Sequence, residues 1–512
     1  MSVFRLAALI ATSALTQTPS GWSRRECTSC YPNNAVIRSL VGETTLAACQ
    51  AACQAEPRCA YVNIALPPGN QACWLFATCG SPEVKPGCGG GWWTTYTLQG
   101  RASARLWPPT AAGFTGKIKA MWFGANVTGL DTDETLALMA KHTVAGYGWE
   151  TGGDTSTSAA VGWGEAFGSA AVVHARDYMD SHNNSNGTVL FQYRQIQVAL
   201  RLYSQSAIAA ADPRNSGFWL KDSTTGRVCA TPSPWGTDDP FWDFRNESAV
   251  DYWIDHVVGQ VAADPAMAGR PSAVFFDEAD QGDCGDRVTS CDLSKLNHTA
   301  TQHASIHAMF PRMVAALNDA GIVPMFSLMN RFTAAADRIL DAPVPCALPE
   351  DDVAAALKGL AWVRFYENWP GSFWLNNTVV SASPDIDAMF IANAILEAEA
   401  GIPTALHVDA GGAGAACPAK ARSISRPGPL GGPIEFWIAS YLVVAGAGST
   451  LSISNNWFDA DFCWRSELDV EYGTPLGPAV RTATHTWARN FTRCSVTIDV
   501  SVVRQGRVHL LP

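Results

Sequence analysis

Basic residues are scarce in this 512-residue chain: 35 lysines and arginines stand against 46 aspartates and glutamates, for a formal net charge of −11. An acidic surface repels phosphate backbones and anionic headgroups, so we expect neither nucleic acid nor a charged membrane as a partner. Long apolar runs are missing as well. The main later candidate, residues 436–448, is short and interrupted by serine and glycine, which predicts a buried helix leading into a strand and no integral membrane segment.

Several catalytic signatures are also absent. No GxGxxG follows the first expected strand, which argues against a dinucleotide cofactor. Neither a GxSxG nucleophile elbow nor an HExxH zinc motif occurs. His407 and Asp409 are spaced as a metal pair, but spacing places no third ligand beside them, so we expect neither a metal nor a cofactor.

Cysteine, by contrast, is plentiful: eight of the 15 cysteines lie between Cys27 and Cys88, as in disulfide-stapled domains of oxidising compartments. Residues 1–20 carry Arg5 and then LAALIATSAL, which predicts a secretory signal peptide; a disordered apolar N-terminus is the alternative. Sequons for N-glycosylation agree with a secreted or lumenal glycoprotein. They stand at Asn126, Asn183, Asn186, Asn246, Asn297, Asn376 and Asn490.

Residues 27–98 form a module too small for a large core, so it needs disulfides to fold. Spacing leaves the connectivity open, and metal binding is the alternative use of the cysteines, although no CxxC pair repeats with zinc-finger spacing. The run LAACQAACQAEPRCAYVNI, followed by Cys73 in QACWLF, resembles an apple/PAN module. This resemblance implies pairing of Cys49 with Cys73 and of Cys53 with Cys59, and a glycan or protein ligand for the module.

After a linker at 99–116, short apolar strands alternate with helical patterns over 117–490. This order predicts an α/β fold, a (β/α)₈ TIM barrel, with a doubly wound open sheet as the alternative. Residues 491–512 alternate apolar and polar and predict a short C-terminal β hairpin. The barrel strands are expected within 117–126, 142–150, 188–195, 272–280, 321–328, 360–367, 401–410 and 449–454.

The stretch SAVFFDEAD at 272–280 organises the barrel region, because its apolar run ends abruptly in two carboxylates. Cys284 and Cys291 are expected to close the following loop with a disulfide. In a barrel, the C-terminal ends of all eight strands face one mouth. Carboxylates, amides and indoles at these ends suit a polyhydroxylated ligand. The predicted substrate-binding residues are Trp122, Trp149, Glu150, Tyr193, Arg194, Glu278, Asn330, Trp369, Asp409 and Asn455.

Glycosidic bond cleavage needs two carboxyl groups: one protonates the leaving oxygen, and the other attacks the sugar or activates water. Asp277 ends strand four and Glu367 ends strand six, so the pair can flank a substrate. We predict Asp277 as nucleophile or base and Glu367 as general acid. The alternatives are a loop-capping role for Asp277 and a structural ion pair of Glu367 with Arg364 or Arg194. Alternation then predicts four side chains inside the barrel below the pair: Ala273, Phe275, Val363 and Phe365.

FWDFRNESAVDYWIDHVV leading into AVFFDEAD, then RFYENW, and finally YGTPLGPAVRTATHTWARNF at 472–491, resemble a group of TIM-barrel glycoside hydrolases. The last motif resembles their last barrel helix and small terminal strands. The resemblance implies carbohydrate hydrolysis without a metal. Families with a nucleophilic Asp after strand four and an acid after strand six are the nearest analogy, although Glu367 stands where they carry Asp. Families with Glu after strands four and seven would favour Glu278, but strand seven offers Asp409.

We therefore predict a secreted or lumenal glycoside hydrolase that cleaves O-glycosidic bonds of a carbohydrate substrate. The alternative is a catalytically inactive barrel that binds carbohydrate or protein in adhesion, and a metal-dependent hydrolase is a third reading. Two carboxyl groups at reacting distance distinguish the first from the second. Outside the N-terminal module, Cys417, Cys463 and Cys494 are expected to be disulfide partners rather than nucleophiles.

Overall fold

The computed structural model divides into two compact units, residues 1–102 and 103–512. Within the residues described, no helix is long and apolar enough to cross a membrane. These residues are 22–26, 28–29, 36–41, 49, 52, 61–65, 72–76, 83–84, 93–98, 107, 114–124, 132–148, 163–182, 188–222, 225–232, 238–264, 267, 272–277, 299–328, 353–367, 369–370, 373–375, 378–380, 383–409, 428–431, 434–454, 464–501 and 505–512.

The first unit contains a five-stranded antiparallel sheet in the order β1-β7-β4-β5-β3, and β2 pairs with β6. Cys49 and the β5 residue Cys73 are fully buried and form a disulfide with a Cα–Cα distance of 6.1 Å, the pairing that the apple/PAN resemblance implied. Cys53 and Cys59 lie outside the described residues. The strands are β1 (Trp22–Glu26), β2 (Thr28–Ser29), β3 (Val36–Val41), β4 (Tyr61–Ala65), β5 (Ala72–Phe76), β6 (Glu83–Val84) and β7 (Trp93–Leu98).

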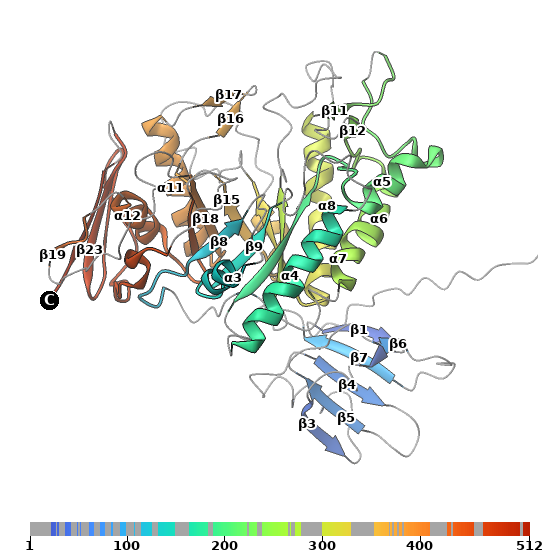
Figure 1. The fold of residues 1–512 in the computed structure, drawn as a ribbon, viewed down its shortest axis with the longest axis horizontal. Helices are drawn as coiled ribbons and strands as arrows, with labels where there is room; N and C mark the ends of the chain where they lie inside the picture. The colour runs from blue at the N-terminus through green and yellow to red at the C-terminus, as the bar shows by residue number, and fades with distance from the viewer. Residues whose placement is uncertain are drawn as a thin grey trace, which may run out of the picture. The chain divides into compact units, whose positions relative to one another are not determined.

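The second unit is built on an eight-stranded parallel sheet that forms a nearly closed barrel (Figure 1). Its ends meet where Ala120 bridges Leu451, whose N–H donates to the Lys119 carbonyl at 3.0 Å. The Trp107 indole also donates to the Gly448 carbonyl at 2.7 Å. Closure makes the open-sheet alternative wrong. In barrel order the strands are β8 (Met121–Gly124), β9 (Val144–Tyr147), β10 (Val189–Gln195), β13 (Ser272–Asp277), β14 (Ile322–Ser327), β15 (Val363–Tyr366), β18 (Thr404–Asp409) and β20 (Thr450–Ser454).

Side chains alternate between the barrel interior and an outer layer that packs against the helices. Glycine at position 146 is required for this packing, because a Cβ there would overlap the ring of Phe191. The four side chains predicted to lie inside below Asp277 and Glu367 are confirmed. The interior cluster from the strands comprises Met121, Phe123, Val144, Val189, Phe191, Tyr193, Ala273, Phe275, Val323, Met325, Val363, Phe365 and Ala405.

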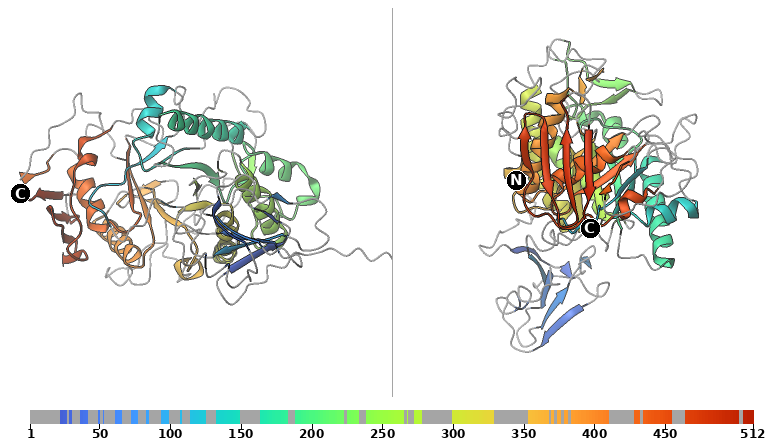
Figure 2. Two further views of the ribbon diagram at one scale, coloured as in Figure 1. Left: turned by 90° about the horizontal axis from the view of Figure 1, so that it is seen from below. Right: turned by 90° about the vertical axis from the view of Figure 1, so that its left-hand side faces the viewer.

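Helices follow the strands around the barrel (Figure 2, left). Helix α6 begins at Glu247, because the Asn246 side chain caps it by accepting the Ser248 N–H at 3.0 Å. Pro311 lies inside α8. The helical elements are α3 (Asp133–Met139), α4 (Trp163–Ser181), α5 (Ser204–Ala211), η1 (Pro213–Asn215), α6 (Glu247–Tyr252), the π-helical η2 (Trp253–Val258), α7 (Gly259–Ala263), α8 (Thr299–Asp319), α10 (Val353–Ala356), α11 (Pro384–Glu399), α12 (Glu435–Val444) and η5 (Ser466–Asp469).

The C-terminal part is larger than the predicted hairpin. It forms a five-stranded antiparallel sheet in the order β19-β24-β23-β22-β21, which packs on α12 (Figure 1; Figure 2, right). Within 472–491 the chain forms β21 and β22, in keeping with the small terminal strands that the resemblance implied, but it forms no helix there. Cys494 is buried in β23, and its disulfide pairing stays a prediction. The remaining strands are β11 (Ala230–Pro232), β12 (Asp238–Pro240), β16 (Phe373–Leu375), β17 (Thr378–Val380), β19 (Gly428–Pro429), β21 (Val480–Ala483), β22 (Thr486–Asn490), β23 (Cys494–Asp499) and β24 (Gln505–Leu510).

Candidate active site

Asp277 is the last residue of β13 and lies half-buried on the inner face of the barrel. The hydroxyl of Tyr193, from the neighbouring strand β10, donates to Asp277 Oδ2 at 2.6 Å. Tyr193 is itself fixed, because the Tyr203 hydroxyl donates to its carbonyl at 3.1 Å. A short hydrogen bond of this kind orients a carboxylate and favours its ionised form. Asp277 is therefore arranged as a nucleophile or base needs to be.

Glu367 directly follows β15 and is also half-buried. Its Oε2 lies 3.5 Å from Ser327 Oγ, on the inner face of β14, the strand between β13 and β15. Strand pairing places Asp277 level with Ser327, and Glu367 two residues nearer the mouth. With strands about 4.8 Å apart and a rise of about 3.3 Å per residue, the two Cα atoms are about 12 Å apart. Side chains that converge from this separation can reach the carboxyl spacing of glycosidases, roughly 5–9.5 Å.

His407 lies next to Glu367 on the inner face of β18 and is completely buried. Its Nδ1 is 2.7 Å from the Glu367 carbonyl oxygen, which can only accept, so Nδ1 carries the proton. Its Nε2 lies 2.9 Å from Ser454 Oγ in β20 and accepts from that hydroxyl. Burial lowers the His407 pKa to about 4, so the ring is neutral near pH 7.

Metal binding is not supported around His407, because both ring nitrogens already bond to protein groups. Among the residues that the structure describes, no group of three or more histidines, cysteines, aspartates or glutamates is placed to hold a metal ion. Asp409, the other member of the pair considered from the sequence, ends β18, and its side chain is outside the described residues.

Trp122 does not line the mouth. It lies between the inward-facing Met121 and Phe123, so alternation turns it to the outer face of β8. There it is 2 % exposed and packs edge-to-face on Tyr147, with ring centroids 5.6 Å apart. This position does not support the predicted substrate contact.

Trp369 is likewise an outer-layer residue, with 2 % of its surface exposed. Its indole donates to Ser440 Oγ in α12 at 3.0 Å, and its backbone N–H donates to the His407 carbonyl at 2.8 Å. The ring is therefore held against α12 and is not a stacking platform for a sugar.

Arg194 faces outward from β10 and is 3 % exposed. Its guanidinium stacks over the Tyr203 ring at 4.6 Å, and Nη1 donates to the Tyr193 carbonyl at 2.8 Å. Arg194 thus supports the backbone of Tyr193 instead of contacting a ligand at the mouth. The other predicted residues, Trp149, Glu150, Glu278, Asn330, Asn455, Cys284 and Cys291, lie outside the described residues, and their roles stay predictions.

The alternative role of Glu367, an ion pair with Arg364, is not what the structure shows, because Arg364 pairs with a different carboxylate. Arg364 faces the outer layer, where its Nε lies 3.9 Å from Glu397 of α11. The Tyr366 hydroxyl donates to Glu397 Oε2 at 2.6 Å, and the Asn393 amide donates to that hydroxyl at 2.7 Å. Burial raises the pKa of both Tyr366 and Glu397. This cluster anchors β15 from behind, immediately before Glu367.

Sequence reasoning missed Ser327, Ser454 and the bonding role of His407. Each lies two residues after an inward-facing residue of the same strand: Ser327 after Met325, Ser454 after Ser452, and His407 after Ala405. Counting in twos along the inner face of each strand would have identified them.

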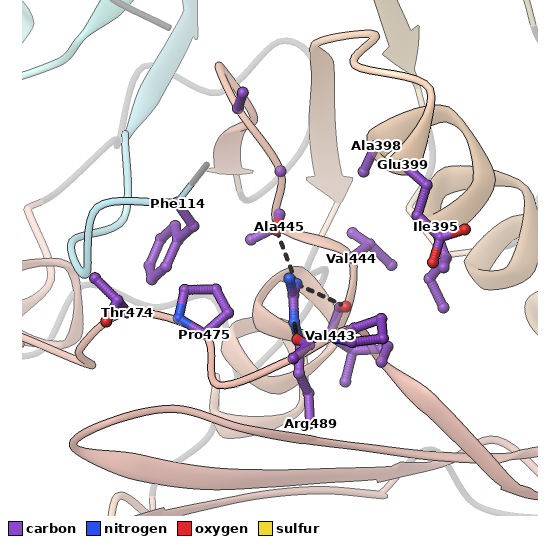
Figure 3. A pocket seen from close by; sticks show the side chains of 15 residues that line it. Phe114, Ile395, Ala398, Glu399, Val443, Val444, Ala445, Thr474, Pro475 and Arg489 are labelled. Carbon is purple, nitrogen blue, oxygen red and sulfur yellow. Dashed lines mark hydrogen bonds between the residues drawn. The ribbon is translucent and has the colours of Figure 1, made fainter. Parts of the chain in front are cut away.

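A cavity of about 490 Å³ lies away from this mouth, between the ends of α11 and α12 and the 474–479 segment (Figure 3). It is on the side where barrel strands begin, because α12 leads directly into β20. Arg489 lines it, but Nη1 donates to the carbonyls of Leu442, Val443 and Ala445 at 3.1, 3.1 and 2.8 Å. Arg489 therefore caps the C-terminal end of α12, which accounts for its place in the 472–491 motif.

Comparison with known proteins finds no matching family model and no matching curated protein. Among solved structures, the chain is similar to a GH31 dextranase of Flavobacterium johnsoniae, with a TM-score of 0.39, 11% identity, and coverage of 79% of this chain and 44% of the dextranase. The chain is also similar to an α-N-acetylgalactosaminidase of Bifidobacterium bifidum, with a TM-score of 0.39 and 11% identity. The match covers 96% of this chain and 72% of that protein. For an α-galactosidase of Thermus thermophilus, the TM-score is 0.34 and the identity is 14%. That match covers 86% of this chain and 76% of the α-galactosidase. Similarity this weak does not extend to function or to individual residues, and the chain spans less than half of the dextranase.

Proposed function

We propose that this chain is a glycoside hydrolase that cleaves O-glycosidic bonds at the mouth of its barrel. One observation carries the proposal: Asp277 ends strand four, Glu367 directly follows strand six, and the Tyr193 hydroxyl donates to the Asp277 carboxylate at 2.6 Å. In barrels, the strand ends at this face carry the chemistry.

In the proposed reaction, Glu367 gives its proton to the leaving oxygen as the glycosidic bond breaks. Asp277 either attacks the anomeric carbon, forming a glycosyl ester that water then hydrolyses, or removes a proton from an attacking water. In both cases one water is consumed and two hydroxyl products form. Carboxyl groups about 5–5.5 Å apart give retention, and about 6.5–9.5 Å give inversion.

The interior below the pair is apolar and supports this chemistry. Phe275 packs against Phe123 and Phe365, with ring centroids 5.1 Å and 4.6 Å apart. These rings fill the barrel under both carboxylates and keep water out from below. A low-dielectric floor strengthens the electrostatic contacts made at the mouth.

Secretion and a binding role for residues 27–98 belong to the same proposal. The supporting observations are the cysteine density of this module, the Cys49–Cys73 disulfide, the sequons and the apolar segment within residues 1–20. On this proposal the module binds a glycan or a protein and brings the barrel to its carbohydrate substrate.

The test is hydrolysis of a broad panel of natural and aryl glycosides by the full chain, with Asp277→Asn and Glu367→Gln alongside. We expect the wild type to cleave at least one glycoside and each variant to lose at least about a hundredfold in kcat on natural glycosides. Asp385→Asn is the control, because this exposed carboxylate on α11 pairs with His485 and should leave the rate unchanged.

Two results would contradict the assignment. If a variant keeps the wild-type rate on the natural glycosides, whose leaving groups need protonation, its carboxylate has no catalytic role. If the wild type cleaves nothing but retains glycans on a column, the chain is a binding protein.

A further inference from the structure

The carboxylate of Glu367 belongs to a residue that the barrel ladder does not hold. The last pairing of β15 with β18 joins Tyr366 to Leu406, so Glu367 stands one residue beyond it. A general acid must be held to within a fraction of an ångström of its productive position, since a displacement of about 1 Å can cost about a hundredfold in rate. The contacts made by its backbone therefore bear on the position of the acid.

His407 contacts Glu367 through its side chain and Trp369 through its main chain. Its Nδ1–H donates to the Glu367 carbonyl at 2.7 Å, and its own carbonyl accepts the Trp369 N–H at 2.8 Å. The Trp369 indole is in turn bonded to Ser440 Oγ at 3.0 Å. Glu367 and Trp369 are thus both bonded to β18, and Trp369 is also bonded to α12.

The ring of His407 is also fixed in one orientation. The Ser454 hydroxyl occupies Nε2 at 2.9 Å, and the rings of Phe123 and Phe365 lie 6.1 and 6.2 Å from the imidazole by their centroids. The side chain is fully buried, so it is not placed to exchange protons with a substrate. A hydrogen bond in such an apolar setting is stronger than one in water.

We propose that His407 is a positioning residue, which holds Glu367 in place for proton donation through the Nδ1–H bond to the Glu367 carbonyl. The inference rests on the proposed function, because it assigns His407 to the general acid of that reaction. It goes beyond it by identifying which group keeps the acid in place.

Two variants test separately the contributions of Nδ1 and Nε2 of the imidazole. His407→Asn retains an amide N–H near the position of Nδ1, whereas His407→Gln places its amide near Nε2 and removes the donor to Glu367. We expect kcat on a glycoside with an alkyl or sugar leaving group to fall about 10- to 100-fold in His407→Gln and only a few-fold in His407→Asn. KM should change little in either.

The dependence of the rate loss on the leaving group tests this role, because a purely structural defect would slow all substrates alike. A 2,4-dinitrophenolate leaves without protonation, so cleavage of a 2,4-dinitrophenyl glycoside does not need the acid. We expect His407→Gln to cleave it with nearly the wild-type kcat/KM, which reports the step that breaks the glycosidic bond, as Glu367→Gln should. Ser454→Ala removes the partner of Nε2 and keeps the imidazole. We expect it to slow cleavage of the alkyl or sugar glycoside by a smaller factor and to leave cleavage of the dinitrophenyl glycoside nearly unchanged.

The outcomes distinguish the two proposals. If Glu367→Gln shows the leaving-group pattern but His407→Gln slows both substrates equally, or His407→Asn loses as much as His407→Gln, the role of His407 is overturned. Should His407→Gln fail to fold, an equal slowing of both substrates in Ser454→Ala has the same meaning. If the wild type cleaves neither substrate, or Glu367→Gln lacks the pattern, the proposed function fails and this inference with it.

Discussion

Tyr193 connects the barrel wall to the proposed nucleophile or base, since its hydroxyl donates to Asp277 Oδ2 at 2.6 Å. A hydrogen bond to a charged group contributes about 1.5–3 kcal/mol. Tyr193→Phe removes only this donor, so we expect kcat on the cleaved glycoside to fall about 10- to 100-fold, the rate equivalent of that energy. Steady-state kinetics of the purified variant measure the loss.

Tyr252→Phe on α6 provides the matched control for Tyr193→Phe. Its hydroxyl donates to the Gln205 carbonyl at 3.2 Å, in the outer layer rather than at the mouth. We expect this variant to keep the wild-type kcat. Equal rates in both variants would show that Tyr193 does not orient the nucleophile.

The chemistry of individual residues was predictable only in part. Asp277, Glu367 and Tyr193 were chosen because carboxyl and hydroxyl groups follow apolar strands, and the structure brings them to the inner face. Trp122 and Trp369 were chosen for their type and their nearness to strand ends. A strand end has two faces, and the buried outer layer takes indoles as readily as the mouth does.

At the scale of elements, the C-terminal sheet depends on one close approach to α12. A Cβ at Gly506 of β24 would lie 2.7 Å from Phe436 Cα and 2.8 Å from Ala439 Cβ, both in α12. Gly506→Ala must therefore push the strand away from the helix. We expect it to reduce the free energy of unfolding by about 1–3 kcal/mol, as overpacking does. Denaturant unfolding of the purified chain is the measurement.

Gly477→Ala adds the same methyl group where nothing lies within 4 Å, so the free energy of unfolding should stay within about 0.5 kcal/mol of wild type. A Gly506→Ala protein as stable as this control would mean that β24 does not press on α12 as the structure shows.

The barrel strands were predictable because burial on both faces gives each an apolar run with sharp ends. The C-terminal sheet was underestimated for the opposite reason. All four residues of β21 are exposed, and β19 contributes only Gly428–Pro429 from a distant part of the chain. Neither segment has an apolar pattern that a sequence reading could detect, so only the central strands were expected.

For the whole molecule, buried histidines make stability depend on pH. Burial lowers the pKa of His142 from 6.5 to about 4. Between these values the unfolded chain binds a proton that the folded chain does not, so stability falls as the pH falls from 6.5 toward 4. From pH 7 to 4.5, His142 alone should account for a loss of about 2–3 kcal/mol. The raised pKa of Glu397 acts in the opposite direction.

Comparison with His142→Asn isolates this contribution, because Glu397 is common to both proteins. We expect the free energy of unfolding of the variant to fall less between pH 7 and pH 4.5, by about the amount assigned to His142. His182→Asn, which changes an exposed histidine after α4, should keep the wild-type pH dependence. Parallel curves for wild type and His142→Asn would show that His142 is not held neutral by the fold.

The strand patterns alone could not decide between a barrel and an open sheet, because an apolar strand has the same sequence pattern in both. The deciding contacts, Ala120 with Leu451 and Trp107 with Gly448, join segments with no local signal for one another.

These two contacts also set the order of events during synthesis. Trp107 and Gly448 are 341 positions apart, so nearly the whole second unit must be translated before the ends of its sheet can meet. Until β20 has left the ribosome, the nascent sheet has unpaired edges at β8 and β18, and such edges invite association with other chains. Completion of the barrel is therefore a late step, and chaperones that cover nascent sheet edges would act before it.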